Sequence, residues 1–91
     1  MEEIEKLRSD LDEIDIKILQ LLMRRTEIVK EIGLIKKQYD IPVVDRRREK
    51  KVYNNVKEFA LEHELDSEQI ESIFRKIMQF SKKVQSEILK K

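Results

Sequence analysis

The sequence predicts an all-α protein: three helices per chain, the first very long, assembled as an intertwined homodimeric helical bundle. Three observations lead to this prediction. Charged residues make up 43% of the 91 residues, with one Gly, one Pro and no Cys, a composition typical of helical bundles and not of sheets. Apolar residues recur at helical spacing in three separate stretches. The first of these stretches is too long for a compact domain of this size.

The first helix is expected to run from about Glu2 to about Tyr39. Along its inner seam, steps of three and four residues alternate without a slip through Ile4, Leu7, Leu11, Ile14, Ile18, Leu21, Arg25, Ile28, Ile32, Ile35 and Tyr39. At about 1.5 Å per residue the helix exceeds ~50 Å, whereas a compact domain of this size has a radius of gyration of about 12 Å. The helix therefore extends beyond its own subunit, and a second copy must cover the seam. Gly33, which weakens the helix by about 1 kcal/mol, indicates a close approach by another helix or a ligand.

The second helix is expected after a break at Asp40–Val43, where Pro42 disfavours a helical conformation of the residue before it. Asp45 is a suitable N-cap for a helix from Arg46 to about Leu61. Its apolar stripe would consist of Val52, Tyr53, Val56, Phe59 and Ala60.

The third helix is expected to open at Asp66–Gln69, which has the pattern of a capping box. Ser81 and Gln85 lie one turn apart and interrupt its apolar face, which is formed by Ile70, Ile73, Phe74, Ile77, Val84 and Ile88. The chain shows no repeat and no linker, so residues 1–91 are expected to form one domain.

Charge and residue counts argue against several functional classes. A net charge of +1 does not favour nucleic acid as a partner. With no Cys and one His, neither a disulfide framework nor a His/Cys metal cluster is expected. The chain does not start like a signal peptide, and no apolar run approaches the length of a membrane span. We therefore expect a cytoplasmic protein that contacts no membrane.

A binding pocket is predicted from polar residues on apolar faces. Arg25 is the one charged residue on the inner seam, where a cation costs several kcal/mol unless an anion meets it. Lys36 follows eleven residues later and points the same way, about 16 Å along the helix. Singly, these residues are most simply explained as an ion pair or solvated surface, and Ser81 and Gln85 as packing residues. Together they predict a polar pocket for a dianion.

Arg8 lies seventeen residues before Arg25, about 25 Å away and roughly 100° around the helix. It therefore cannot reach the same ligand from its own chain, but an antiparallel twofold partner would bring it there. No candidate general base lies on a seam, and no Ser-His-Asp or Cys-His set exists. The pocket thus suits a reaction that needs orientation and electrostatic stabilisation.

The ordered set of these residues resembles the all-α chorismate mutases over essentially the whole chain. The first helix of that family is similar to segments Leu7–Arg8, Leu11–Asp15, Leu21–Arg25 and Ile35–Lys36. Its loop and second-helix start resemble Pro42–Glu49, and its third helix resembles the Ser81-x-x-x-Gln85 pattern. The resemblance implies an intertwined dimer that rearranges chorismate to prephenate, on the way to phenylalanine and tyrosine. It implies no cofactor and no covalent intermediate.

The resemblance also implies roles for the substrate-contacting residues. Arg8 of the partner and Arg25 would clamp the two carboxylates of chorismate, with Ser81 assisting. Lys36 and Gln85 would hydrogen-bond the ether oxygen as its bond stretches.

The ring hydroxyl would be held at the start of the second helix, by Asp45, Arg48 and Glu49. One departure stands beside this set: Lys82 falls where the resemblance leads us to expect an apolar pocket wall.

Two alternatives remain open. A lyase of the same fold eliminates pyruvate from isochorismate, although the Asp45–Glu49 stretch favours the mutase. A helical dimerisation module without chemistry is the other, and it predicts that Arg25→Leu stabilises the dimer without loss of function.

Overall fold

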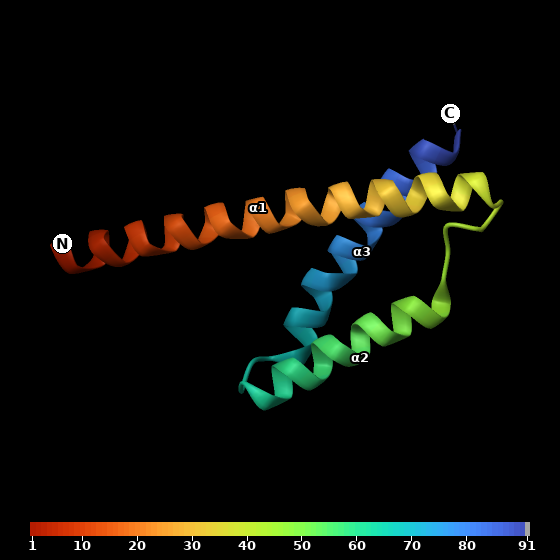
Figure 1. Cartoon of the computed structure of the whole chain (residues 1–91). Coiled ribbons are helices and arrows are strands. Elements are labelled where there is room, and N and C mark those ends of the chain that lie inside the picture. Colours follow the sequence, from red (N-terminus) through yellow and green to blue (C-terminus); the bar gives the residue numbers. More distant parts are fainter. Residues whose placement is uncertain (91) are drawn as a thin grey trace.

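The computed structural model describes residues 1–90, which form three α-helices and no strand. The helices are α1 (Glu2–Gln38), α2 (Arg46–Glu62) and α3 (Ser67–Lys90) (Figure 1). The predicted all-α class is confirmed, and the helix bounds lie close to the expected ones. The homodimeric assembly stays a prediction.

The helix ends are set by local hydrogen bonds that the sequence indicated. The Asp45 carboxylate accepts from the backbone N–H of Arg48 at 3.0 Å and caps α2. Asp66 accepts in the same way from Gln69 N–H at 3.2 Å, at the start of α3. At the end of α1, Asp40 adopts a left-handed φ of 56°, and the N–H of Ile41 bonds back into the last turn. These caps fix where each helix starts or stops.

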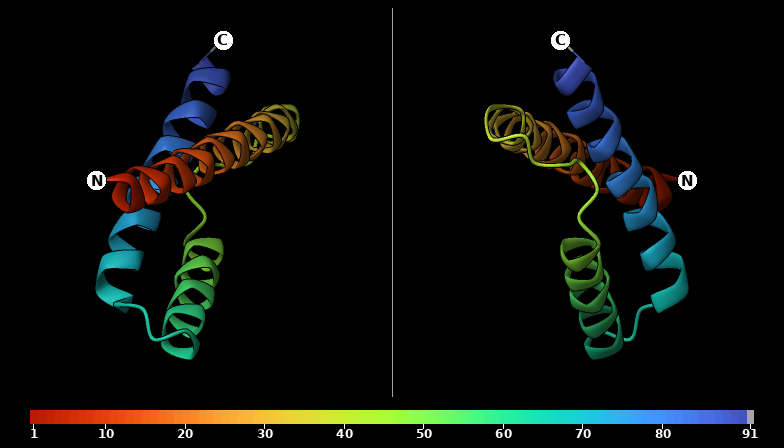
Figure 2. Two further views of the ribbon diagram at one scale, coloured as in Figure 1. Left: turned by 90° about the vertical axis from the view of Figure 1, so that its left-hand side faces the viewer. Right: turned by 90° about the vertical axis from the view of Figure 1, so that its right-hand side faces the viewer.

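The three helices do not form a closed bundle. α3 packs against the C-terminal half of α1 and also against α2, whereas α1 and α2 do not pack on each other (Figures 1 and 2). The N-terminal half of α1 projects away from the other two helices (Figure 1). The principal extents are 56 × 27 × 14 Å and the radius of gyration is 16.6 Å, against about 12 Å for a compact domain of this length.

The α1–α3 contact depends on a close approach at Gly33. A Cβ added there would lie 3.3 Å from Ile88 Cδ1 and 3.4 Å from Gln85 Cγ, both on α3. The glycine therefore marks the approach of another helix, one of the two occupants that the sequence suggested. Val29 and Gly33 are the buried residues of α1, and neither belongs to the inner seam.

The core that one chain can build is small. Val52 and Val56 of α2 and Met78 of α3 are buried together, with Tyr53, Ile70 and Phe74 packed against them. Phe59, expected on the same stripe, is instead 55% exposed. Every residue from Met1 to Leu21 is exposed, including the apolar seam. No helix within residues 1–90 is long and apolar enough to cross a membrane.

Candidate active site

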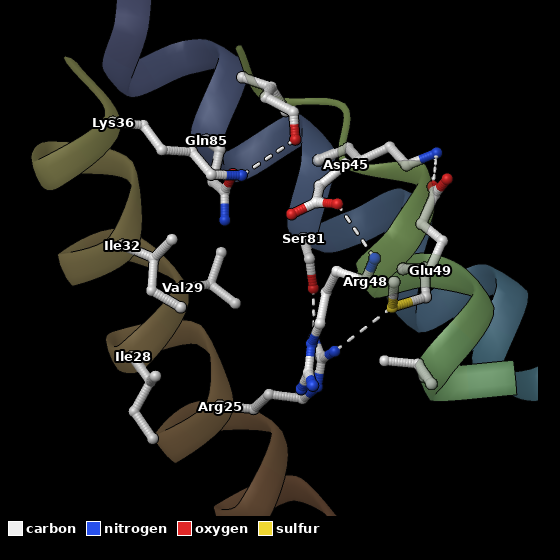
Figure 3. Close-up of a pocket in the computed structure, with 14 residues that line it drawn as sticks. Arg25, Ile28, Val29, Ile32, Lys36, Asp45, Arg48, Glu49, Ser81 and Gln85 are labelled. Atoms are coloured by element: carbon white, nitrogen blue, oxygen red, sulfur yellow. Dashed lines mark hydrogen bonds and ion pairs between the residues drawn. The ribbon is translucent and has the colours of Figure 1, made fainter. Parts of the chain in front are cut away.

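A cavity of about 380 Å³ lies between the C-terminal half of α1, the start of α2 and the middle of α3 (Figure 3). Its volume falls within the usual range for small-molecule sites. All predicted site residues except Arg8 line it: Arg25, Lys36, Asp45, Arg48, Glu49, Ser81 and Gln85. The tertiary structure thus brings together residues from three separate helices, while their roles toward a substrate remain predictions.

Arg25 is held in place from α3. Its Nη1 donates to Ser81 Oγ, and its Nη2 lies 3.5 Å from Met78 Sδ. The Ser81 hydroxyl in turn donates to the Ile77 carbonyl at 3.0 Å. Because the Ser81 oxygen accepts from the guanidinium, this serine orients Arg25 in the cavity. The remaining N–H groups of Arg25 are available to a ligand.

Arg48 brings a second guanidinium to the same cavity. Burial first, and the like charge of Arg48 second, lower the pKa of Arg25 below its ordinary value. The guanidinium nevertheless stays protonated near neutral pH. Within residues 1–90, neither arginine forms an ion pair with a carboxylate. Two adjacent cations without a carboxylate partner, lining a cavity, form a site suited to an anion.

Lys36 and Gln85 form a second polar pair, at the other end of the cavity (Figure 3). Lys36 Nζ donates to Gln85 Oε1 at 3.0 Å and to the Val43 carbonyl at 3.0 Å. An ammonium has three N–H donors, so one remains for a ligand. Because the amide oxygen of Gln85 is used by Lys36, its amide nitrogen remains as a donor. The pair therefore offers two adjacent hydrogen-bond donors to a ligand.

Glu49 and Lys82 close the wall between α2 and α3. The ammonium of Lys82 forms an ion pair with the Glu49 carboxylate, and both residues line the cavity. The unexpected Lys82 thus has a specific partner. The cavity lining then contains four cationic side chains and two carboxylates, a surplus of two positive charges that suits a doubly negative ligand. The cations are Arg25, Lys36, Arg48 and Lys82, and the carboxylates are Asp45 and Glu49.

Comparison with known proteins places the chain in a family. A family model described as chorismate mutase type II matches residues 7–86. The chain belongs to this family. The match includes every residue proposed above for the site.

Individual relatives agree with this placement. The chain is 34% identical over 89 residues to a chorismate mutase of Methanocaldococcus jannaschii, covering 98% of this chain and 90% of that protein. It is 38% identical over 56 residues to a bifunctional chorismate mutase/prephenate dehydratase of Aquifex aeolicus, covering 62% of this chain and 16% of that protein. A T-protein of Haemophilus influenzae is 30% identical over 81 residues, covering 89% of this chain and 22% of that protein. The chain thus spans most of the first relative and less than a quarter of the other two.

Arg8 is the one predicted site residue that the single chain does not bring to the cavity. It lies on the projecting half of α1, where it pairs with Glu5 at 2.8 Å, and both side chains are 66% exposed. Such an exposed pair within one helix contributes little to stability and does not hold Arg8 in place. In the single chain the Arg8 side chain therefore stays exposed to solvent, and its role in trans remains a prediction for this chorismate mutase family member.

Sequence reasoning missed part of the site. Met78 lines the cavity and contacts Arg25, and the carbonyl of Val43 accepts from Lys36. Met78 lies one turn before Ser81, and this spacing was a usable signal. A backbone carbonyl has no sequence signal. No group of His, Cys, Asp and Glu within residues 1–90 is arranged to hold a metal ion.

A second, more apolar cavity of about 530 Å³ adjoins the first. Arg25, Arg48 and Val52 line both cavities, so the two cavities lie side by side. The rest of its lining comes from α2, α3 and the turn between them: Asn55, Val56, Phe59, Leu65, Ile70 and Phe74.

Proposed function

We propose that this protein is a chorismate mutase, an isomerase that converts chorismate to prephenate by an intramolecular Claisen rearrangement. The observation that carries the proposal is the pair of arginines, Arg25 and Arg48, that line the cavity without a carboxylate partner among the described residues. Family membership supplies the substrate, a dicarboxylate with an ether oxygen and a ring hydroxyl.

The carboxylate end of the site is assigned to the arginines. Arg25, oriented by Ser81, would bind one carboxylate through its free N–H groups. Arg8 of a second subunit would bind the other. Both interactions hold the substrate with its two reacting ends together, which lowers the entropic part of the barrier.

The ether end is assigned to Lys36 and Gln85. Charge develops on the ether oxygen as its bond to carbon breaks, so donors aimed at that atom bind the transition state more tightly than the substrate. The mutual hydrogen bond between the two side chains preorganises them. Each such donor contributes on the order of 3 kcal/mol to lowering the barrier. No proton transfer is required.

The ring hydroxyl is assigned to the first turn of α2. Glu49 would accept its hydrogen bond, while Arg48 and the capped backbone at Asp45 complete the contact. The Glu49 carboxylate, which accepts a hydrogen bond and carries negative charge, favours a substrate hydroxyl over a third carboxylate there.

The working enzyme is proposed to be an intertwined homodimer in which Arg8 acts in trans. The exposed seam of α1, the extended shape and the open second cavity support this arrangement. A partner's α1 laid antiparallel along the first would cover the seam and carry its Arg8 toward Arg25.

The direct test is loss of chorismate absorbance with purified protein, followed by product analysis. Prephenate as the product supports the proposal. Pyruvate and salicylate from isochorismate, without prephenate from chorismate, would identify a lyase instead. A protein that consumes neither substrate, and in which Arg25→Leu stabilises a dimer, would be a dimerisation module.

A further inference from the structure

Lys82 forms an ion pair unlike the others in the described chain. The Glu5–Arg8 and Arg24–Glu27 pairs lie within α1, three residues apart, with all four side chains at least 55% exposed. The Lys82–Glu49 pair instead joins α3 to α2, and the Glu49 side chain is only 20% exposed. Exposed pairs within a helix contribute little. A half-buried pair between helices restricts where its carboxylate can lie.

The Glu49 carboxylate has competing partners nearby. Arg48 is its neighbour on α2, and Arg25 lies close enough to Arg48 for the two charges to interact. A carboxylate that turned toward the guanidiniums would form a bidentate pair, the most favourable geometry available to both groups. That pairing would occupy the arginines that the proposed function assigns to the substrate.

We propose that Lys82 is a positioning residue that holds the Glu49 carboxylate against the α2–α3 wall and away from Arg25 and Arg48. Held there, Glu49 keeps an oxygen free to accept a hydrogen bond from the substrate hydroxyl, and Arg25 and Arg48 stay free for the substrate. The inference rests on the proposed function for the identity of the substrate. The Lys82–Glu49 ion pair, and the place of Glu49, Arg25 and Arg48 in the lining of one cavity, do not depend on that identity.

The mechanism predicts a specific kinetic pattern. In Lys82→Met, Glu49 pairs with the arginines, so a substrate must displace it before binding. KM for chorismate should rise about tenfold while kcat changes less than about threefold, as expected for two coupled residues. Lys82→Arg retains the cation and should stay within about threefold of wild type in kcat/KM. Lys83→Met removes the same charge from an exposed neighbouring position and should match wild type.

The decisive variant combines two changes. Glu49→Gln removes the carboxylate that competes for the arginines, so Lys82→Met should add less than about a twofold further loss of kcat/KM in that background. If Lys82 touched the substrate directly, its loss would cost the same tenfold in both backgrounds, and the inference would be overturned. An equal loss in Lys83→Met would also overturn it, because net charge alone would then explain the effect.

A binding measurement separates this inference from the proposed function. Malonate, a small dicarboxylate, serves as the calorimetric probe of the arginines. Lys82→Met should weaken malonate binding about tenfold, and adding Glu49→Gln should restore it to within about twofold of wild type. Failure of the second change to restore binding would overturn the positioning role, whether or not wild type produces prephenate. Thermal melting of each variant verifies that it is folded; Lys82 is 40% exposed, so its replacement should leave the fold intact.

Discussion

The two halves of α1 share one sequence pattern but differ in what packs against them (Figure 1). From Thr26 onward, Val29 and Gly33 are buried against α3, and Lys36 reaches the cavity. From Met1 to Leu21 every residue is exposed, although the seam is just as apolar there; Leu7 is 61% and Leu11 57% exposed. Figure 1 shows the reason, because α3 crosses only the C-terminal half.

One chain therefore brings together most of the residues predicted for the site, while the N-terminal half of its first helix is left without a covering element. A projecting apolar helix half without a covering element is unfavourable in water, because each buried side chain of this kind contributes roughly 1.5–3 kcal/mol. The covered half holds the polar residues that the cavity needs. The uncovered half holds the N-terminal part of the seam and Arg8. A second copy of the chain would cover the exposed part of the seam and would bring its own Arg8 to the cavity of the first.

The largest loss of activity is expected when either Arg8 or Arg25, which lie on opposite halves of α1, is replaced. Arg8→Ala and Arg25→Ala homodimers should each lose about a hundredfold or more in kcat, on the order of 3 kcal/mol, because each lacks one charged contact to the transition state. Co-refolding equal amounts should restore about a quarter of wild-type activity. Half of the dimers would be mixed, and each would contain one site with both arginines. A mixture no more active than the separate variants would show that Arg8 is not contributed in trans.

The next effect concerns the seam of the uncovered half. Leu11→Ala should weaken dimer association by roughly 1.5–3 kcal/mol, because Leu11 is exposed in the single chain and expected to be buried in the dimer. Ser9→Ala, on the same exposed half but outside the seam, is the matched control. Light scattering over a dilution series measures the difference. Wild type that remains a folded, active monomer at micromolar concentration would disprove the dimer and the shared site together.

A pH-dependent effect is expected in the covered half. The Gln85 amide does not titrate, and no histidine lines the cavity within residues 1–90, so wild-type kcat/KM should be nearly flat from about pH 5 to 8. In Gln85→Glu the donor exists only while the introduced carboxyl is protonated. Its reference pKa of about 4.3 would be raised by burial and by the substrate's charges and lowered by Lys36.

The expected result is a variant that is active in acid and loses activity as pH rises, while wild type does not. The measurement is kcat/KM against pH for both proteins. Parallel profiles would show that Gln85 does not contact the breaking bond, and the assignment of Gln85 to the ether oxygen would be withdrawn.

The smallest effect is expected at Gly33. In Gly33→Ala the new methyl would meet Ile88 Cδ1 at 3.3 Å and Gln85 Cγ at 3.4 Å. Ile88 can move its flexible end, and alanine favours the helix by about 1 kcal/mol, so the melting temperature should change little. Displacement of Gln85 should nevertheless lower kcat by a few-fold, since small misplacements of catalytic groups reduce rates. Unchanged kcat would mean that Gln85 tolerates this displacement.

The local features of this protein could be predicted from its sequence. Helix type and helix ends follow from spacing and caps within a few turns, as the Asp45 and Asp66 caps illustrate. The polarity of Ser81 and Gln85 against their apolar face indicated a pocket before any contact was known. Gly33 also indicated a close approach, although not which element would approach.

Contacts between side chains that are distant in the sequence became clear only from the fold. The sequence assigned Ser81 to the substrate, whereas the fold also makes it the acceptor that orients Arg25. The sequence indicated no role for Lys82, whereas in the fold Lys82 forms an ion pair with Glu49. Contacts between helices depend on how the helices cross, and the crossing is set by small residues and side-chain volumes summed over the whole interface. No local pattern contains that information, which is why Val29 and Gly33, not the inner seam, form the buried face of α1.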